Sequence, residues 1–519
     1  MVLKLAASLP RSQLVRFGAS RTVIPAGLRT ILPRQASGQR RTMATETQPP
    51  AKPLAEAKLS TADIKHTTLY SGRTASYPLN ISIIGCGLGG LAAAFCLARA
   101  GHKVSIFESA PAIGEVGAGI QMTPNLTRLL IRWGCGDVLK ACTVTPSAIA
   151  LRRWKDGELV GWTRWGDDME NEHGAPYYHI HRADLHKLLF DLAVPHINLH
   201  LSSRVDSINP SLPSPSITLS TGQVIPTDLI IGADGVKSMI REVVVGGPDR
   251  PVATGDAAYR AIVSTDDMMK DETLKHLVDE QEMTGWMGPE RHIMAYCIRA
   301  KKEYNLVMVH PDDGSVESWT AEGSADKLRA DFAGFEPRVE KLLKLVPSTL
   351  KWKLMDRAPL HKWVHDEGRV VLLGDACHPM LPYRAQGAAM AVEDGCILGN
   401  LFSRLSHPSQ ITPFLHAYER LRLPRTSATQ ASARLNQKIF HYPDGPEQQA
   451  RDESMRKALR IARGEEKEVD DGKGSYNQWA DKGKNREQFS YDADLEAERW
   501  WKEEGERTLG AGEGVTSKM

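Results

Sequence analysis

The sequence has very little net charge. Lysine and arginine together number 65 against 63 acidic residues, so the formal net charge of the 519-residue chain is only +2. The basic residues are interleaved with acids, whereas nucleic-acid-binding domains gather them on one face. We therefore expect no nucleic-acid partner. The composition, 41% hydrophobic and 25% charged, is ordinary for a soluble globular protein, and this length predicts more than one domain.

Cysteine is also scarce. There are seven cysteines, an odd number, and no two of them have the CxxC or zinc-type spacing that marks a redox pair or a metal site. We interpret them as reduced, buried thiols of a protein that is not secreted. No group of histidine, cysteine and carboxylate residues has metal-ligand spacing, so no metal is predicted.

Long hydrophobic runs are missing as well. The nearest to one, residues 81–98, is uncharged and mostly apolar or glycine, and it is almost long enough to cross a bilayer. Its glycine spacing is better explained by a buried strand, turn and helix. We therefore predict no transmembrane span.

Acidic residues are absent from the first 45 positions. This stretch contains several serines, and the first acid is Glu46. Its basic residues are Lys4, Arg11, Arg16, Arg21, Arg29, Arg34, Arg40 and Arg41. An arginine-rich, acid-free leader is typical of a mitochondrial transit peptide, which we predict for residues 1–45. The alternative is a disordered leader that has no targeting function. An internal start at Met43 would give a cytoplasmic form.

The first folded unit is expected just after a linker. Residues 46–77 are polar and contain prolines, which is typical of a linker. Residues 80–84 then predict a short buried strand, a helix follows to about residue 101, and residues 103–107 predict a second buried strand. This order is the opening of a βαβ unit.

A glycine motif lies between the first strand and the helix. Gly85, Gly87 and Gly90 fit GxGxxG, in which the glycines allow a tight turn, the approach of a pyrophosphate and close packing of helix on strand. Glu108 ends the second strand, where an acid binds ribose hydroxyls. This context predicts a dinucleotide site, with phosphates at the helix N-terminus. The alternative is a glycine-rich helix start used only for packing.

Three further motifs give the chain a family resemblance. They are Gly-Ala-Gly-Ile-Gln at 117–121, a strand followed by Gly-Ala-Asp-Gly at 228–241, and a strand followed by Gly-Asp-Ala-Cys-His-Pro at 369–379. With these in this order, the chain resembles the FAD-dependent aromatic-ring monooxygenases of the para-hydroxybenzoate hydroxylase fold group, and among them the fungal salicylate-hydroxylase-like proteins. The resemblance covers about residues 79–440.

The resemblance implies how FAD is bound. Ala118 and Gly119 would lie beside the flavin, Asp234 would serve both nucleotides, and Asp375 would hold the ribityl chain. Arg182 matches the arginine that reaches the FAD. The helix beginning at Gly387 and Ala388 would direct its N-terminal N–H groups at the flavin, where a positive dipole end stabilises an anionic reduced ring.

The resemblance also implies the fold, an α/β (α+β) architecture. A Rossmann-like FAD-binding domain would consist of residues 78–250, with a β excursion near 147–165, and residues 351–440, which end in C-terminal helices. A β-sheet substrate domain, residues 251–350, would be inserted between them. The remaining segment, 441–519, is highly charged, which predicts a solvated helix or disorder. Within it, Asn477-Gln478-Trp479 and Tyr491-Asp492-Ala493 resemble the C-terminal ends of fungal relatives.

The resemblance implies an activity too. NADH or NADPH would reduce the FAD, O2 would form a flavin C4a-hydroperoxide, and its distal oxygen would be transferred to a small phenolic or hydroxybenzoate-like ring. The protein would orient, desolvate and deprotonate the substrate. Candidate catalytic residues are Tyr259, Arg260, His292 and Tyr383, because tyrosine or histidine can take a phenol proton and arginine can bind a carboxylate.

Several alternatives stay open. Tyr259 and His292 could instead be ordinary residues of a sheet. In one departure from the family, Ala385 stands where many members have glycine, which affects the shape of the pocket above the flavin. An FAD-dependent oxidase, or a biosynthetic hydroxylase of quinone or secondary metabolism, is a second reading, and a non-catalytic flavin-binding protein is a third. The halogenase signature WxWxIP is absent. The sequence carries no signal for the oligomeric state.

Overall fold

The computed structural model describes residues 60–507 except 63, 66, 115–116, 118, 316–320 and 468–475. The predicted leader, residues 1–45, therefore lies outside the described residues, as do Ala118 and half of the predicted linker, including residues 46–59. The sections below concern the described part of the chain.

A five-stranded parallel sheet forms the nucleotide-binding half. Its order is β18-β11-β1-β2-β7, with β1 Asn80–Ile84, β2 Lys103–Phe107, β7 Asn198–His200, β11 Leu229–Gly232 and β18 Val370–Leu372. The central strands are short apolar runs with buried residues on both faces, as expected when helices cover a parallel sheet. The strands predicted at 80–84, 103–107, 228–232 and 369–373 are confirmed.

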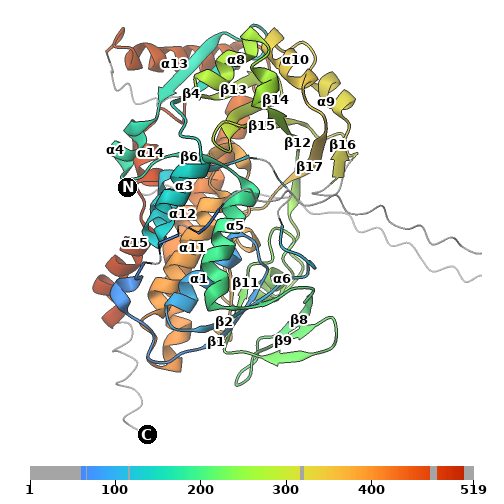
Figure 1. The fold of residues 1–519 in the computed structure, drawn as a ribbon. Helices are drawn as coiled ribbons and strands as arrows, with labels where there is room; N and C mark the ends of the chain where they lie inside the picture. The colour runs from blue at the N-terminus through green and yellow to red at the C-terminus, as the bar shows by residue number, and fades with distance from the viewer. Residues whose placement is uncertain are drawn as a thin grey trace, which may run out of the picture. The chain divides into compact units, whose positions relative to one another are not determined.

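Helices pack tightly in this half. The main ones are α1 Leu88–Arg99, α5 Arg182–Ala193, α11 Gly387–Phe402 and α12 Ile411–Phe440, and α11 and α12 run beside one another in Figure 1. A Cβ at Gly395 of α11 would lie 2.6 Å from the backbone nitrogen of Ala93 in α1. Helices α1 and α11 therefore approach each other more closely than a side chain at Gly395 would permit.

An eight-stranded sheet forms the other half, in the order β16-β17-β12-β15-β14-β13-β4-β5. Its strands are β4 Ala148–Arg153, β5 Leu159–Arg164, β12 Val252–Ser264, β13 Met283–Gly288, β14 Arg291–Ile298, β15 Glu303–Pro311, β16 Ala321–Gly323 and β17 Thr349–Asp356. The β excursion expected near 147–165 is part of this sheet. The domain boundary expected at residue 350 falls inside β17.

Three helices cover the outer side of this sheet: α8 Glu272–Asp279, α9 Ala325–Asp331 and α10 Pro337–Lys344 (Figure 1). The smaller elements are β3 Gly119–Met122, β6 Tyr178–His181, β8 Val205–Asn209, β9 Ser216–Leu219, β10 Val224–Pro226, α2 Pro124–Leu130, α3 Gly136–Cys142, α4 Asp167–His173, α6 Met239–Val245 and α7 Thr265–Met268. Part of the sheet's second face lines a cavity, and part of it packs on C-terminal residues such as Met455 of the helix that follows α12.

The described part of the charged C-terminal segment is folded. It forms α13 Pro446–Ala462, α14 Lys482–Phe489 and α15 Ala493–Trp500, and Met455, Trp479, Phe489 and Trp500 are all buried. A helix was one of the two expectations for this segment, but the helices are packed rather than solvated. Charge runs in sequence do not show that one face of each helix is apolar.

Two negative expectations can be compared with the described residues. All seven cysteines are free thiols, six of them buried. Within the described ranges, no helix has the length and apolar character needed to cross a membrane.

His102 makes the fold sensitive to acid. Its Nδ1 accepts a hydrogen bond from the Leu79 N–H at 3.1 Å, and its Nε2 lies 3.1 Å from the Phe402 carbonyl oxygen. The ring must therefore be neutral with its proton on Nε2. Burial lowers the pKa of His102 from 6.5 to about 4, although the Phe402 carbonyl acts in the opposite direction.

We expect the stability of the protein to fall between pH 7.5 and pH 5. The unfolded histidine takes up a proton near pH 6.5, whereas the folded one resists protonation until about pH 4, so acid favours the unfolded state by roughly 2 kcal/mol at pH 5. Urea unfolding at both pH values checks this. In His102→Gln the difference between the two pH values should shrink, and an unchanged difference would show that His102 is not responsible.

Candidate active site

A cavity of about 370 Å³ connects the two halves of the chain. Its lining residues come from the ends of the parallel sheet, including Gly87 and Asp375, and from the eight-stranded sheet, including Val307 and Trp352. Ligands of open parallel sheets bind beyond the carboxyl ends of the strands. The cavity therefore occupies the expected place for a nucleotide cofactor and extends to a second, mostly apolar wall.

The glycine turn at the start of α1 has the geometry of a pyrophosphate site. Gly85 has φ +106°, and a Cβ there would lie 2.4 Å from the Ala233 carbonyl oxygen. A Cβ at Gly90 would lie 2.2 Å from the carbonyl oxygen of Gly85. At Gly87, by contrast, a Cβ would meet nothing within 4 Å and would point into open space beside the cavity. Each predicted glycine thus has its own physical reason, and the space at Gly87 fits a bound phosphate group.

Glu108 lies next to this turn, as predicted. Its carboxylate accepts hydrogen bonds from the N–H groups of Cys86 at 2.9 Å and Ala110 at 2.8 Å. These bonds fix the carboxylate at the end of β2. A carboxylate oxygen can accept more than one hydrogen bond, so Glu108 can still bind ribose hydroxyls.

Gly119 and Arg182 both line the cavity. A Cβ at Gly119 would lie 2.7 Å from Tyr296 and from Asn305, and its N–H donates to the Asn305 Oδ1 at 2.7 Å. This glycine is therefore required for close packing as well as for its place beside the cavity. Arg182 is the first residue of α5. The backbone of Gly117 packs closely against its side chain, because a Cβ built at Gly117 would lie 2.9 Å from the Arg182 Cδ.

Asp375 is the best-supported cofactor residue of this half. It follows β18 in a short 3-10 turn, lines the cavity, and receives no hydrogen bond from the described residues. The surrounding protein raises its pKa by desolvation, an effect that His378 and Arg182 partly offset. An accessible carboxylate without a donor in the described part of the chain fits a chain of ribityl hydroxyls.

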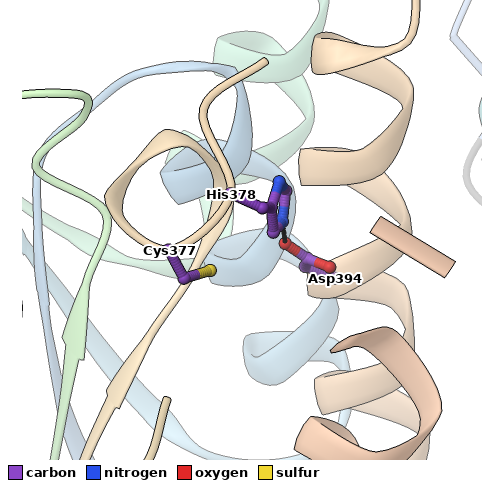
Figure 2. A group of neighbouring side chains, drawn as sticks. All are labelled: Cys377, His378 and Asp394. Carbon is purple, nitrogen blue, oxygen red and sulfur yellow. Dashed lines mark hydrogen bonds and ion pairs between the residues drawn. The ribbon is translucent and has the colours of Figure 1, made fainter. Parts of the chain in front are cut away.

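A buried network holds the loop that carries Asp375. Figure 2 shows His378 pointing at Asp394, with a distance of 2.6 Å from Nε2 to Oδ2. Asp394 also accepts from the Gly374 N–H at 3.0 Å and from the Arg422 Nε at 2.7 Å. Although burial raises the pKa of Asp394, His378 and Arg422 lower it to about 2. The sequence did not identify Asp394 or Arg422 as supports of this loop.

Three buried side chains, those of Cys377, His378 and Asp394, lie close enough together to be metal ligands, although their spacing in the sequence does not indicate a metal site. The ligand atoms of Cys377, His378 and Asp394 lie within 4.8 Å of one another (Figure 2). Hydrogen bonds account for this proximity, because Asp394 binds His378 and the Arg422 cation, and the Cys377 thiol donates to the Gly374 carbonyl oxygen at 3.4 Å. Burial also raises the pKa of the Cys377 thiol, so it is held in its protonated form.

Asp234 does not turn its carboxylate to the cavity in the way the motif suggests. It accepts from the Ser238 hydroxyl at 2.5 Å and from the Met239 N–H at 2.8 Å, which caps α6. Its neighbours Ala233 and Gly235 line the cavity instead. The motif therefore places backbone at the cofactor, and the aspartate stabilises the turn.

The N-terminus of α11 faces the cavity, as predicted. Gly387 and Ala388 both line it, and a Cβ at Gly387 would meet only Met380, at 3.9 Å. Gln386 is fixed by Thr123 and Asn125, with both side-chain distances 3.0 Å. Thr123 and Asn125 therefore help to position the N-terminus of α11. No pattern in the sequence indicated this role.

The far end of the cavity is mainly apolar. Its wall consists of Met283, Met294, Tyr296, Val307, Val309, Trp352, Leu354, Phe440 and Trp479. Most of these residues come from the inner face of the eight-stranded sheet, and such a wall suits an aromatic ring. The predicted Arg260 also lines it, with its guanidinium 4.0 Å above the Trp352 ring.

Tyr259 does not reach the cavity. Its hydroxyl donates to Asp331 at 2.8 Å and its ring stacks on His310, among the residues beneath the outer helices. Successive residues of a strand point to opposite faces of a sheet. Because Arg260 faces the cavity, Tyr259 must face away, and the prediction that it is catalytic is wrong.

Tyr383 lines the cavity, but its hydroxyl is already committed. It donates to the Asp256 carboxylate at 2.8 Å, and burial followed by the nearby Asp256 charge raises the pKa of Tyr383. A phenol held in its protonated form is a poor base. Tyr383 therefore contributes a ring surface and a link to Asp256.

His292 is a side chain of the cavity wall that can act as a base. Its Nδ1 lies 2.8 Å from the Nε2 of His441. Burial, followed by the charge of His441, lowers the pKa of His292 well below its usual value, and burial lowers that of His441 to about 4. Both rings are therefore neutral near pH 7. His441 in turn lies 3.7 Å from Asp256 and borders a second hollow with exposed residues.

Ala385 has the backbone conformation that explains the family's glycine. Its φ is +53°, in the left-handed region, which costs a residue with a side chain roughly 1 kcal/mol. The loop keeps its shape here despite the substitution, with the Ala385 N–H donating to the Pro382 carbonyl oxygen at 3.0 Å.

We expect Asp375→Ala to weaken FAD binding roughly tenfold or more, because hydrogen bonds to a charged group contribute about 1.5–3 kcal/mol. Fluorescence titration of the apoprotein with FAD measures this. Asp366→Ala, which removes an exposed carboxylate paired with Lys362, is the control and should bind FAD as the unaltered protein does. Equal affinities for the two variants would exclude Asp375 from the cofactor site.

Comparison with known proteins agrees with this geometry. The FAD binding domain family matches residues 79–433. An FAD-dependent monooxygenase of Beauveria bassiana is 36% identical over 384 residues, which is 73% of this chain and 89% of the relative. A 3-hydroxybenzoate 6-hydroxylase of Klebsiella oxytoca is 35% identical over 71% of this chain and 90% of the relative.

A solved structure supports the same assignment. The substrate complex of a salicylate hydroxylase superposes with a TM-score of 0.65 at 25% identity, covering 81% of this chain and 97% of that protein. The predicted α/β fold with an FAD-binding domain is thereby confirmed. The chain therefore belongs to the family of FAD-dependent aromatic-ring monooxygenases.

Proposed function

We propose that the protein uses NADH or NADPH and O2 to hydroxylate a small phenolic acid of the hydroxybenzoate or salicylate type. The observation that carries this proposal is the single cavity that joins a dinucleotide turn to an apolar wall containing His292 and Arg260. Bound FAD would supply the redox chemistry, taking electrons from the nicotinamide and using them to activate O2.

Four features of the chain would hold that cofactor. Gly87 leaves room for the pyrophosphate, Glu108 accepts from the ribose, and Asp375 accepts from the ribityl hydroxyls. The N-terminus of α11 at Gly387 presents N–H groups and a positive dipole end to the flavin edge. The apolar wall would keep water away from the reacting groups on its side of the cavity.

His292 would accept the proton of the substrate phenol. A phenolate is more electron-rich than a phenol, so deprotonation activates the ring. The imidazole must be neutral before this step, and burial keeps His292 neutral, although the lowered pKa of His292 also makes it a weaker base. His441 is 2.8 Å behind it and borders the second hollow, so the pair offers a path by which the proton leaves the cavity.

Arg260 would orient a substrate carboxylate. Its guanidinium lies flat over Trp352, and a stacked guanidinium can still bind a carboxylate through its edge. Two relatives support an acidic substrate by their names, the 3-hydroxybenzoate 6-hydroxylase and a 6-hydroxynicotinate 3-monooxygenase of Bordetella bronchiseptica.

The test is oxidation of NADH and NADPH by the FAD-loaded protein with a panel of hydroxybenzoates and salicylate, with peroxide and product both quantified. We expect one or more acids to stimulate oxidation and to be hydroxylated. Oxidation of a substrate to peroxide without a nicotinamide would instead identify an oxidase. Loss of all stimulation across the panel would reject phenolic acids as substrates.

A further inference from the structure

Trp479 brings the C-terminal segment into the cavity wall. It lies between α13 and α14, is 3% exposed, and lines the same cavity as Gly87 and His292. The FAD binding domain match ends at residue 433, so this part of the wall lies beyond the matched domain. The motif Asn477-Gln478-Trp479 has no role in the proposed reaction.

Trp479 is held from several sides. Its ring is 5.6 Å from that of Trp165 and is stacked 6.4 Å from that of Phe489. The Asn485 side chain donates to the Trp479 carbonyl oxygen at 2.7 Å. The indole is therefore held in a fixed position, and an aromatic substrate in the cavity would pack against it.

Arg384 joins this segment to the active-site loop. It lies between Tyr383 and Ala385, is 1% exposed, and has its guanidinium 4.6 Å above the Trp479 ring. It donates to the Gln478 carbonyl oxygen at 3.1 Å and to the Gln488 side chain, also at 3.1 Å. Burial lowers the pKa of Arg384 to about 10.

Among the described residues, the hydrogen-bond acceptors of Arg384 all belong to the C-terminal segment, Asn485 being the third at 3.5 Å. A buried guanidinium that loses its acceptors is strongly destabilised. Docking of the C-terminal segment therefore contributes to the position of the loop that carries Tyr383, together with the bonds of Tyr383 to Asp256 and Asn436. Two further arginines hold the segment, with Arg128 donating to the Tyr491 carbonyl oxygen and Arg425 to that of Gln488.

We propose that residues 476–489 form a specificity wall, in which Trp479 sets the largest ring that the substrate site accepts and Arg384 holds the wall in register with the active-site loop. This inference rests on the proposed function. It predicts opposite effects of removing the indole: a one-ring substrate loses a packing surface, whereas a two-ring substrate gains the space.

The test compares Trp479→Ala with Trp500→Ala, a second buried tryptophan of the same segment, which packs on Phe414 and is not in the cavity wall. The probes are 3-hydroxybenzoate and 1-hydroxy-2-naphthoate. In Trp479→Ala we expect the ratio of kcat/KM for the two-ring acid over the one-ring acid to rise at least roughly tenfold, about 1.4 kcal/mol, with FAD content unchanged. Trp500→Ala should keep the ratio of the unaltered protein. An unchanged ratio in flavin-loaded Trp479→Ala would overturn the proposal.

A second variant guards against misfolding. Trp479→Phe retains an aromatic ring and should shift the same ratio in the same direction, by less; no shift in this variant, if Trp479→Ala does not fold, would also overturn the proposal. Should the unaltered protein hydroxylate neither of these two acids, the wall is tested by binding, and the proposed function is tested separately on the full panel of acids. Perturbation of the flavin absorbance by each acid would then give the two dissociation constants, whose ratio must shift in the same way for the wall to stand.

Discussion

Gly87→Val should yield a folded protein that does not retain FAD. A Cβ at this position meets no protein atom within 4 Å, and the backbone, with φ −77° and ψ −177°, is extended and open to any residue. The added side chain would instead occupy the space of the pyrophosphate. Steric overlap in a packed site costs about 1–3 kcal/mol even when neighbours relax, so we expect a loss of FAD affinity of roughly hundredfold.

The control is Gly247→Val. A Cβ at Gly247 also meets nothing within 4 Å, but this residue is not part of the cavity wall. Both variants should unfold at the same urea concentration as apoproteins, and only Gly247→Val should bind FAD normally in a fluorescence titration. A Gly87→Val protein that is yellow after purification would show that the phosphates lie elsewhere.

His292→Gln should lose most of its hydroxylation rate while still being reduced by the nicotinamide. General base catalysis contributes about 10²–10⁴-fold to a rate, and the loss should appear in kcat. Glutamine keeps polar atoms near His441 but cannot accept the phenol proton. Because free phenols ionise near pH 10, the variant should recover as the pH is raised, by about tenfold per unit.

His310→Gln is the matched control. His310 is buried on the opposite face of the same sheet, stacked on Tyr259, so its loss should affect stability and leave the pH profile of hydroxylation unchanged. The measurement is product formation from pH 6 to pH 9 for both variants. If His292→Gln has the same pH profile as the unaltered protein, His292 acts only through packing.

The dinucleotide site was predictable because its signals are local. Gly85, Gly87, Gly90 and Glu108 lie within 24 consecutive residues, and each is required by the geometry of one turn. Asp375 was identified through the family resemblance, on a motif that directly follows a short apolar strand. Spacing along the chain translates directly into spacing in the structure when the elements are consecutive.

The substrate end could not be predicted in the same way. Whether Tyr259 or Arg260 faces the cavity depends on which face of β12 is covered by helices, and both residues fit a buried strand. His441 lies 149 residues from His292, and Trp479 is more distant still. Such contacts arise only from tertiary packing, which sequence periodicity does not encode.

The charged tail illustrates a different difficulty. Its glutamates, lysines and arginines indicated a solvated surface, but some of its acids form ion pairs with arginines of the body, Glu498 with Arg73 and Asp492 with Arg132. Charge runs are ambiguous because the same residues suit water or an oppositely charged surface. Buried apolar residues such as Met455, Trp479, Phe489 and Trp500 distinguish the two, and they are few in a long polar segment.

The central claim is that the chain inserts one oxygen atom from O2 into an aromatic ring. The most direct measurement is a turnover of the FAD-loaded protein under ¹⁸O2, with NADH or NADPH and the best acid of the panel, followed by mass spectrometry of the product. We expect a product that carries one ¹⁸O atom. A product without the label, or label found only in peroxide and water, would contradict it.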